Sequence, residues 1–390
     1  MNLNYNNLLS ALSLALDVQE YKNMGHARRV AYISLRISEM LNLNEEESKK
    51  VYYSAFLHDI GKGDIYEDFD TDEWWKHSER GSEIVKKLPF GENFSDIIRY
   101  HHENYDGSGY FKLNGDSIPL GAQIVFISDQ FDIRYTSLAG KESEYNIRNN
   151  IKECIKSGTG KMFNPVVANA LLDLTRQEKF WLDYKFFDIK TILKRIEPKD
   201  MVSIGINELE DIAETFAQII DNRSRFTYNH SRGISNLAYN MAKVIGYDEE
   251  VTRKIKIAGL LHDLGKLAIP NSILDKLDKL TEEEFMVIKS HTYYTKEILK
   301  EIGGIDDIAE WAANHHEKLD GSGYPEGLKG DEIGEIDRHV AVCDMYQALT
   351  EDRPYRKGLE PKQAIDIIAK LVKDNKVSGE SLEILKEVVL

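Results

Sequence analysis

The stretch AGLLHDLGKLAI, residues 258–269, has a near copy in SAFLHDIGKGDI, residues 54–65. In both, a His-Asp pair ends an apolar run and is followed one residue later by Gly-Lys. The two pairs lie 204 residues apart, and the same spacing separates His26 from His230 further upstream. Self-similarity at a fixed spacing is typical of a duplicated structural unit. The sequence therefore predicts two tandem copies of one domain.

Downstream of the His-Asp pairs, the spacing between the copies grows to 214 residues. His77 and His291 keep this distance, and so do the segments HHENYDGSGYFKL, residues 101–113, and HHEKLDGSGYPEG, residues 315–327. The second copy therefore carries about ten additional residues, approximately the stretch PNSILDKLDKLTEE. In the Asp-Gly-x-Gly-Tyr part of these segments, glycine permits the backbone conformations of a tight turn.

Length and composition fit two helical domains. A chain of 390 residues exceeds one average domain, and 42% hydrophobic with 30% charged residues is typical of a globular protein. Asn44 and Thr281 each have a Glu three residues later, which is the capping-box spacing of a helix start, and strand patterns are scarce. We therefore expect an all-α fold of two tandem helical bundles, each with about six or seven helices. The expected segments are a first domain at 1–180, a linker or connecting helix at 181–205, and a second domain at 206–390.

Charge and targeting signals exclude several classes of protein. The formal net charge of −16 argues against a broad surface for duplex nucleic acid, which would need a basic footprint. The N-terminal leucines recur at helical spacing, and no run reaches the roughly 20 apolar residues that cross a bilayer. Cys154 and Cys343 give no disulfide framework. We expect a cytoplasmic protein without a membrane partner, and whether it forms a homodimer stays open.

The polar residues that recur in both copies are histidines and aspartates. This donor set without thiolate suits Fe, Mn, Zn or Ni, and it exceeds the four ligands of a single zinc ion. A lone histidine at a helix end is more often a packing residue, but a repeated set next to apolar runs predicts two divalent ions with a bridging carboxylate. The predicted ligands are His26, His58, Asp59, His77, His101, His102 and Asp129 in the first copy, and His230, His262, Asp263, His291, His315, His316 and Asp344 in the second.

Two further pairs of residues stand near these ligands. Lys62 and Lys266 follow the Asp of each His-Asp pair by three residues, where a lysine can hold a phosphate or form a salt bridge instead. Trp74 and Trp75 lie in the shorter loop of the first copy, and we favour packing or a lid over base stacking for them.

The second copy resembles the HD-GYP family, a branch of the HD metal-dependent phosphohydrolases. Its segments HDLGK, HHEKLDGSGYP, VCDMYQALT and DRPYR follow the order of that family's motifs from about Asn229 onward. The resemblance implies a helical domain with a two- or three-metal centre that hydrolyses cyclic di-GMP, or a related cyclic dinucleotide, to linear products. We expect Fe or Mn ahead of Ni or Zn as the two metals of each site.

The same resemblance implies roles for single residues of the second copy. Asp263 would bridge the two metals and, together with Lys266, would serve catalysis. The substrate contacts that the resemblance implies are Lys266, Tyr324, Arg353 and Arg356.

Several positions depart from the family pattern. Some members hold a third metal with a Glu four residues before the first His, and Phe226 stands there in this chain, so we expect two metals. Gln347 replaces an Asp that is more usual in the family. Leu138 and Lys141 stand where the second copy has its two arginines, which leaves Lys62 as the phosphate-binding candidate of the first copy. We therefore expect the first copy to bind metal and to have a regulatory role.

The main hypothesis is a metal-dependent cyclic dinucleotide phosphodiesterase whose second copy is catalytic. Two alternatives for the whole chain stay open: a cyclic dinucleotide receptor without turnover, and another HD phosphohydrolase that acts on nucleotides. The motif DRPYR argues against the latter. A diiron oxygenase is a weaker alternative for the first copy, since only its ligands support it. The native metal, the cyclic dinucleotide, the product and the input signal are not determined by the sequence.

Overall fold

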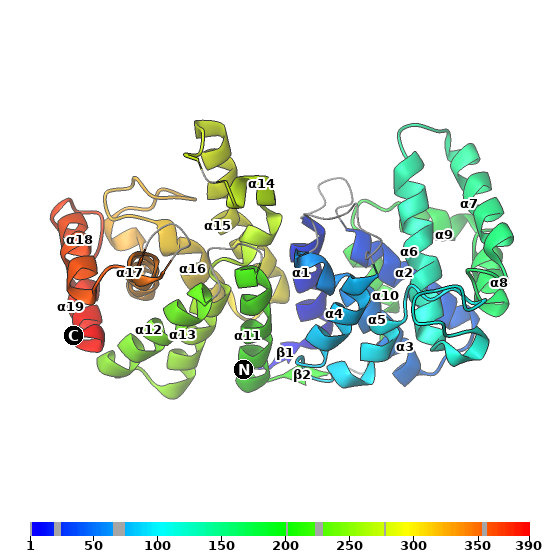
Figure 1. Cartoon of the computed structure of the whole chain (residues 1–390), viewed down its shortest axis with the longest axis horizontal. Coiled ribbons are helices and arrows are strands. Elements are labelled where there is room, and N and C mark those ends of the chain that lie inside the picture. Colours follow the sequence, from blue (N-terminus) through cyan, green and yellow to red (C-terminus); the bar gives the residue numbers. More distant parts are fainter. Residues whose placement is uncertain are drawn as a thin grey trace. The chain divides into compact units, whose positions relative to one another are not determined.

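The computed structural model of the chain describes residues 2–18, 25–64, 75–199, 202–222, 229–276, 278–352 and 357–390. Its elements are helices, apart from two short strands, β1 (Leu3–Asn4) and β2 (Ser203–Ile204). These strands pair antiparallel, with Leu3 opposite Ile204 (Figure 1). The predicted all-α fold is confirmed. None of the described helices combines the length and the apolar character that crossing a bilayer requires.

The chain divides into two compact units. The N-terminal unit contains residues 12–202, and the C-terminal unit contains residues 1–11 and 203–390. The sequence placed residues 1–11 in the first domain, but they group with the C-terminal unit because β1 pairs with β2. The first strand of the chain is thereby joined to the unit that begins about 200 residues later.

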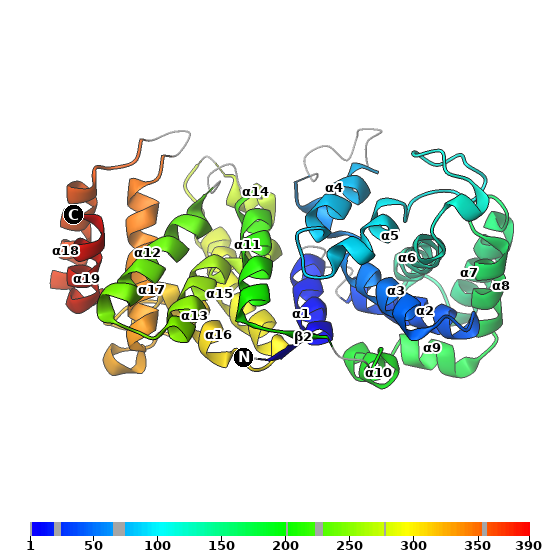
Figure 2. The ribbon, with the colours of Figure 1, turned by 90° about the horizontal axis from the view of Figure 1, so that it is seen from below.

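In the N-terminal unit, α2 and α3 pack together and α6 contacts both of them (Figure 2). The segment 181–205, predicted as a linker or connecting helix, holds the end of α9, all of α10, and β2. The helices of this part of the chain are α1 (Tyr5–Val18, divided between the units), α2 (His26–Met40), α3 (Glu45–Leu57), α4 (Lys76–Val85), α5 (Ser95–Arg99), α6 (Leu120–Leu138), α7 (Glu144–Gly158), α8 (Pro165–Leu174), α9 (Glu178–Tyr184) and α10 (Ile189–Ile196).

The C-terminal unit repeats this arrangement, with α12 packed against α13 and α17. Its described residues from 203 onward form nine α-helices, more than the six or seven predicted, because short helices such as α14 lack a readable hydrophobic period. These helices are α11 (Ile206–Asn222), α12 (His230–Ile245), α13 (Glu249–Leu261), α14 (Asn271–Leu274), α15 (Glu282–Ile302), α16 (Asp306–Ala313), α17 (Glu335–Thr350), α18 (Pro361–Lys373) and α19 (Gly379–Val389).

Capping residues fix the starts of α3 and α15, two of the helices that carry or precede the polar residues repeated in both copies. Asn44 begins α3 and Thr281 begins α15, and each side chain accepts a hydrogen bond from the backbone N–H of the Glu three residues later. Both Glu side chains return a bond to the cap, so the two predicted capping boxes are confirmed. The buried, apolar ends of α3 and α13 then carry the His-Asp pairs into the interior of each unit.

Candidate metal centres

Each unit brings its seven predicted ligands into one cluster. The first histidine opens α2 or α12, the His-Asp pair follows α3 or α13, the next histidine lies on α4 or α15, and the last Asp lies on α6 or α17. The motif glycine allows these elements to approach. A Cβ on Gly61 would lie 2.1 Å from the carbonyl oxygen of His77, and one on Gly265 would lie 1.9 Å from that of His291.

The C-terminal cluster is centred on the carboxylate of Asp263. Its Oδ2 lies 3.0 Å from Nε2 of His262, and its Oδ1 lies 3.4 Å from Nε2 of His291. That nitrogen lies 3.4 Å from Nε2 of His315. Asp263 therefore presents its two oxygens to two different histidines, which is the arrangement expected of a bridging ligand.

Asp344 forms the other side of the C-terminal cluster. Its Oδ1 lies 3.3 Å from Nε2 of His230, and its Oδ2 lies 3.8 Å from Nδ1 of His316. His230, His262 and Asp344 offer ligand atoms within 4.8 Å of one another, and so do His291, His315 and His316. All seven predicted residues of the second copy thus meet in one place.

The N-terminal cluster repeats this geometry around Asp59. Its Oδ1 lies 3.4 Å from Nε2 of His77, and its Oδ2 lies 3.3 Å from Nε2 of His58 and 3.8 Å from Nε2 of His26. Nε2 of His26 also lies 3.3 Å from Oδ1 of Asp129. The bridging position of the second copy therefore has an equivalent in the first.

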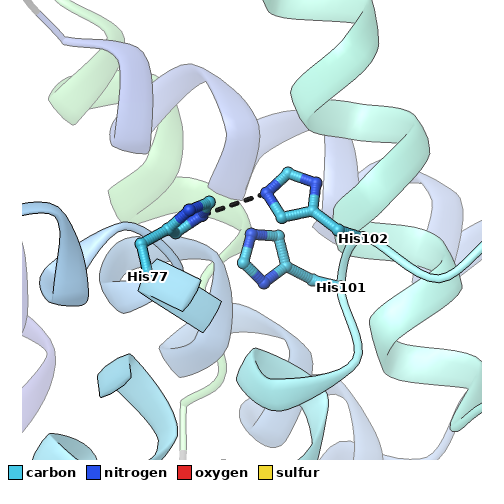
Figure 3. Close-up of side chains that lie close together, drawn as sticks. All are labelled: His77, His101 and His102. Atoms are coloured by element: carbon cyan, nitrogen blue, oxygen red, sulfur yellow. Dashed lines mark hydrogen bonds between the residues drawn. The ribbon is translucent and has the colours of Figure 1, made fainter. Parts of the chain in front are cut away.

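Three histidine side chains of the N-terminal cluster converge from two segments (Figure 3). His77 comes from α4, and His101 with His102 comes from the chain just after α5. Nε2 of His77 lies 3.0 Å from Nε2 of His102, and all three residues offer ligand atoms within 4.8 Å of one another. The prediction that both members of each His-His pair reach the cluster agrees with this geometry.

The orientation of the imidazole rings tests whether a metal fits. Nδ1 of His291 and Nδ1 of His315 lie 2.7 and 2.6 Å from backbone carbonyl oxygens, which only accept, so each Nδ1 carries a proton. Their facing Nε2 atoms are then both acceptors, and two facing lone pairs at 3.4 Å need a cation between them. The same backbone contact orients His58, His101 and His262.

Unsatisfied buried atoms point in the same direction. Among the described residues, Nε2 of His101, Nε2 of His262 and Oδ1 of Asp263 are buried and form no hydrogen bond. Buried polar atoms normally have a partner, because leaving one without a partner costs about 1–3 kcal/mol. Divalent cations in the two clusters would satisfy these atoms, His101 in the N-terminal cluster and His262 with Asp263 in the C-terminal one, so the donor sets fit the metal that the sequence predicts.

Protonation states also suit metal binding. Burial lowers the pKa of His291 and the pKa of His102 to about 3, so both rings are neutral at pH 7. Burial would raise the pKa of Asp263, but the charges of His262 and Lys266 hold it well below its usual range. His230 differs, since hydrogen bonds with Asp344 and Glu351 outweigh burial and raise its pKa to about 9. A metal would displace a proton there.

The two predicted phosphate-binding lysines contact the central carboxylates instead. Nζ of Lys62 lies 2.5 Å from Oδ2 of Asp59, and Nζ of Lys266 lies 2.6 Å from Oδ2 of Asp263. Both lysines thus form ion pairs with these carboxylates, and their binding to a phosphate stays a prediction. Their proximity to the clusters still allows a phosphate to approach them.

The turns after the His-His pairs differ in what their tyrosines contact. The ring of Tyr324 lies 4.9 Å from that of His316, and burial raises the pKa of its phenol. Tyr110, at the same place in the first copy, is half exposed and stacks on Trp75. The predicted substrate contacts Arg353 and Arg356, together with Phe226 and Trp74, lie outside the described residues.

Sequence reasoning missed the acids that orient the first histidine of each cluster. Nδ1 of His26 lies 2.7 Å from Oδ2 of Asp132, which also accepts hydrogen bonds from Arg29 and Tyr184. Nδ1 of His230 lies 3.1 Å from an oxygen of Glu351. Asp132 is the residue that Gln347 replaces in the second copy. Comparison of position 132 with position 347 in the repeat alignment is the sequence signal that could have identified Asp132.

A second missed pair follows the His-His motifs directly. The buried carboxylate of Glu317 accepts hydrogen bonds from the backbone N–H groups of Glu326, Gly327 and Leu328. Glu103 does the same for the backbone of residues 111 and 113 in the first copy. These Glu residues lie 214 residues apart, so the repeat spacing was the signal that identifies them. They hold the Gly-Tyr turn against each cluster.

A third missed pair lies before the first histidine. Asp17 and Asp221 are 204 residues apart, and both are buried. Burial raises the pKa of each carboxyl to about 6. Each accepts a hydrogen bond from the backbone N–H just after the first histidine, at Ala27 or Ser231. These acids therefore fix the first turn of α2 and of α12.

Comparison with known proteins identifies the family of the chain. A family model described as an HD domain matches residues 23–134, and another HD-domain model matches residues 214–379. The chain is 30% identical to the 3′3′-cGAMP-specific phosphodiesterase 1 of Vibrio cholerae, over 98% of this chain and 91% of that protein. The chain belongs to the HD-GYP family. The family resemblance and the two tandem HD domains are therefore confirmed.

Two further comparisons show how much of the chain is similar to known proteins. The chain is 38% identical to a cyclic di-GMP phosphodiesterase of Pseudomonas aeruginosa, over 36% of this chain and 34% of that protein. The crystal structure of a cyclic GMP-AMP-specific phosphodiesterase of V. cholerae covers 99% of this chain, with 98% of its own length matched, a TM-score of 0.72 and 23% identity. The structural match shows that the tandem fold is shared along the whole chain.

Proposed function

We propose that the C-terminal unit hydrolyses a phosphodiester bond of a cyclic dinucleotide at a centre of two divalent metal ions. The observation that carries this proposal is the pair of facing acceptor nitrogens of His291 and His315 beside the carboxylate of Asp263. A site that gathers this many neutral imidazoles and ionised carboxylates has the donor set of a two-metal hydrolase. Fe and Mn are the metals that we expect first, with Ni or Zn as alternatives.

The substrate proposal rests on which relatives share both repeats. The V. cholerae protein that is similar along 98% of the chain is specific for 3′3′-cGAMP. The cyclic di-GMP phosphodiesterase of P. aeruginosa matches 36% of it. We therefore take 3′3′-cGAMP as the first substrate to test and cyclic di-GMP as the second.

Each residue near the centre has a role that its contacts suggest. When bound, the two metals would supply positive charge at the scissile phosphate and activate water for attack. Lys266 keeps the carboxylate of Asp263 ionised through its 2.6 Å contact. Glu351 accepts from His230 and so directs Nε2 of that ring toward Asp344. Tyr324 closes the site beside His316, where it can contact the sugar or base of a substrate.

The N-terminal cluster is proposed as a second metal site with a regulatory role. It retains all seven ligand positions and the lysine, but Leu138 and Lys141 replace the two arginines that the second copy carries in its DRPYR motif. A lysine lacks the planar, bidentate fork with which arginine binds phosphate. The first copy therefore has fewer groups with which to hold a doubly charged cyclic dinucleotide.

The test is hydrolysis of 3′3′-cGAMP and of cyclic di-GMP, followed by product chromatography with Mn or anaerobic Fe supplied. Asp263→Ala should lower the rate at least about a thousandfold, because it removes the carboxylate shared by two histidines. Asp59→Ala is the matched control, since it makes the same change in the other cluster, and it should retain most of the activity.

Three results would contradict the proposal. Loss of activity in Asp59→Ala alone would move catalysis to the N-terminal unit. Tight, saturable binding without product from the parent protein would favour a receptor. Turnover of nucleotide polyphosphates in a competition panel, with both cyclic dinucleotides left intact, would favour another HD phosphohydrolase.

A further inference from the structure

A cavity of about 640 Å³ lies in the N-terminal unit, apart from the turn that closes its metal cluster. It is formed by the start of α2, the end of α6 and the segment that joins α9 to α10. A volume in this range accommodates a small organic ligand. None of the predicted metal ligands lines this cavity.

The lining is basic in a protein that is otherwise acidic. Four cationic side chains and one acid, Asp188, line the cavity, in a chain of net charge −16. Two of the cations are also paired with acids outside the lining, Lys185 with Glu144 at 3.1 Å and Arg29 with Asp132 at 2.6 Å. Asp188 is engaged by Thr191, whose backbone N–H lies 3.3 Å from its Oδ1. The hydrogen bonds from the backbone and side chain of Thr191 stabilise the ionised form of Asp188, so the lining carries one negative charge against four positive ones. The cationic residues are Arg28, Arg29, Lys185 and Lys190.

Aromatic side chains border the same cavity. The rings of Phe186 and Phe187 lie 4.7 Å apart, and Phe187 is 94% exposed. Phe186 is 39% exposed as well, so the two rings form a small aromatic patch rather than a single exposed side chain. An aromatic face next to arginines is the combination that stacks a base while binding a phosphate.

Among the described residues, two features of the cavity differ between the copies. Arg29 corresponds to Gly233 by the 204-residue spacing, and Asp132 corresponds to Gln347. The side chain of Gln347 lies against Gly233, where an added Cβ would be 2.3 Å from it. The second copy therefore fills, with a neutral amide, the place where the first copy has a buried ion pair. The segment of residues 185–190 has no counterpart in the repeat alignment.

We propose that this cavity binds a nucleotide, with its phosphate on the arginines of α2 and its base on Phe187. The site is distinct from both metal clusters and does not rest on the activity of the C-terminal unit. A purine 5′-monophosphate has the required anionic group and planar ring.

Arg29 connects the cavity to the N-terminal cluster. Nε of Arg29 donates to Oδ1 of Asp132 at 2.6 Å, and Oδ2 of Asp132 lies 2.7 Å from Nδ1 of His26. A phosphate that binds Arg29 competes with Asp132 for its guanidinium. Nucleotide binding would then change how firmly His26 is oriented, and linkage requires metal binding to change nucleotide affinity by the same factor.

Calorimetric titration of the full chain with guanosine 5′-monophosphate tests the site, with inorganic phosphate as the second probe. Phe187→Ala should weaken binding of the nucleotide about tenfold, and Lys190→Gln should weaken both probes. Tyr145→Ala is the matched control, because Tyr145 is also an exposed aromatic residue of this unit but lies outside the cavity lining. A binding event unaffected by these changes lies outside this cavity.

Unchanged nucleotide affinity in both cavity variants would overturn the proposal. Phosphate that binds as tightly as the nucleotide would also overturn it, because the aromatic face would then contribute nothing. Equal nucleotide affinity with and without Mn would refute the link to His26 while supporting an isolated site. Loss of the cyclic dinucleotide activity proposed above affects none of these readouts.

Discussion

The two metal clusters use different acids to hold the same histidine nitrogen. In the N-terminal unit, the acid is Asp132, three residues after the last ligand on α6. In the C-terminal unit, it is Glu351, seven residues after the last ligand and just past the end of α17. Positions three and seven residues along a helix share one face, so the acid has moved by one turn without losing its target.

The move changes what each acid is connected to. The side chain of Asp132 is fully buried and is fixed by Arg29 and Tyr184. Glu351 is 12% exposed in its side chain and immediately precedes the DRPYR segment in the sequence. The acid of the N-terminal cluster is therefore fixed by buried neighbours. The acid of the C-terminal cluster is instead adjacent in sequence to the arginines that the family resemblance implies as substrate contacts. This difference favours catalysis in the second copy.

The largest effect on metal affinity is expected when each of these acids is neutralised in turn. Asp132→Asn should weaken metal binding at the N-terminal cluster, and Glu351→Gln should weaken it at the C-terminal cluster, each by about 10–100-fold. Equilibrium dialysis against Mn, with two classes of site resolved, measures both. Each variant serves as the control for the other. If either one weakens both classes equally, the two clusters are not independently held.

A smaller effect is expected at the two turns. Glu317→Gln removes a buried charge that accepts three backbone hydrogen bonds, and Glu103→Gln removes one that accepts two. We expect a loss of local stability of about 1–3 kcal/mol in each, somewhat larger at Glu317. Amide hydrogen exchange of residues 326–328 and 111–113 reports it. Equal exchange before and after substitution would mean that the turns are held by other contacts.

The smallest effect should be the same in both units. Asn44→Ala and Thr281→Ala each remove one side chain of a capping box. Loss of such a cap costs about 1 kcal/mol. Differential scanning calorimetry should show a decrease of a few degrees in the transition of the affected unit. A decrease in one unit alone would show that the helix starts of the two copies do not contribute alike.

Much of the site was readable from the sequence because duplication preserved spacing. The fourteen predicted ligands follow from the 204-, 214- and 215-residue offsets, and the structure brings them into two clusters. The same offsets also relate Asp17 to Asp221 and Glu103 to Glu317. A single carboxylate outside a histidine motif is a weak signal, so these pairs were not predicted. The lysines were placed correctly next to the clusters, but their salt bridges with Asp59 and Asp263 depend on side-chain conformation.

The sequence was sufficient to predict the tandem helical fold, the helix starts and the ligand set. Local capping patterns predict the helix starts, and the repeat spacing predicts the tandem fold and the ligands. Which acid orients His26 or His230 could be found only from the folded chain, because His26 meets Asp132 across 106 residues and His230 meets Glu351 across 121. Tertiary structure also decided that residues 1–11 join the C-terminal unit, and that the arginines of α2 meet the aromatic residues after α9 around one cavity. Such contacts between distant segments leave no periodic signal, so only the folded chain reveals them.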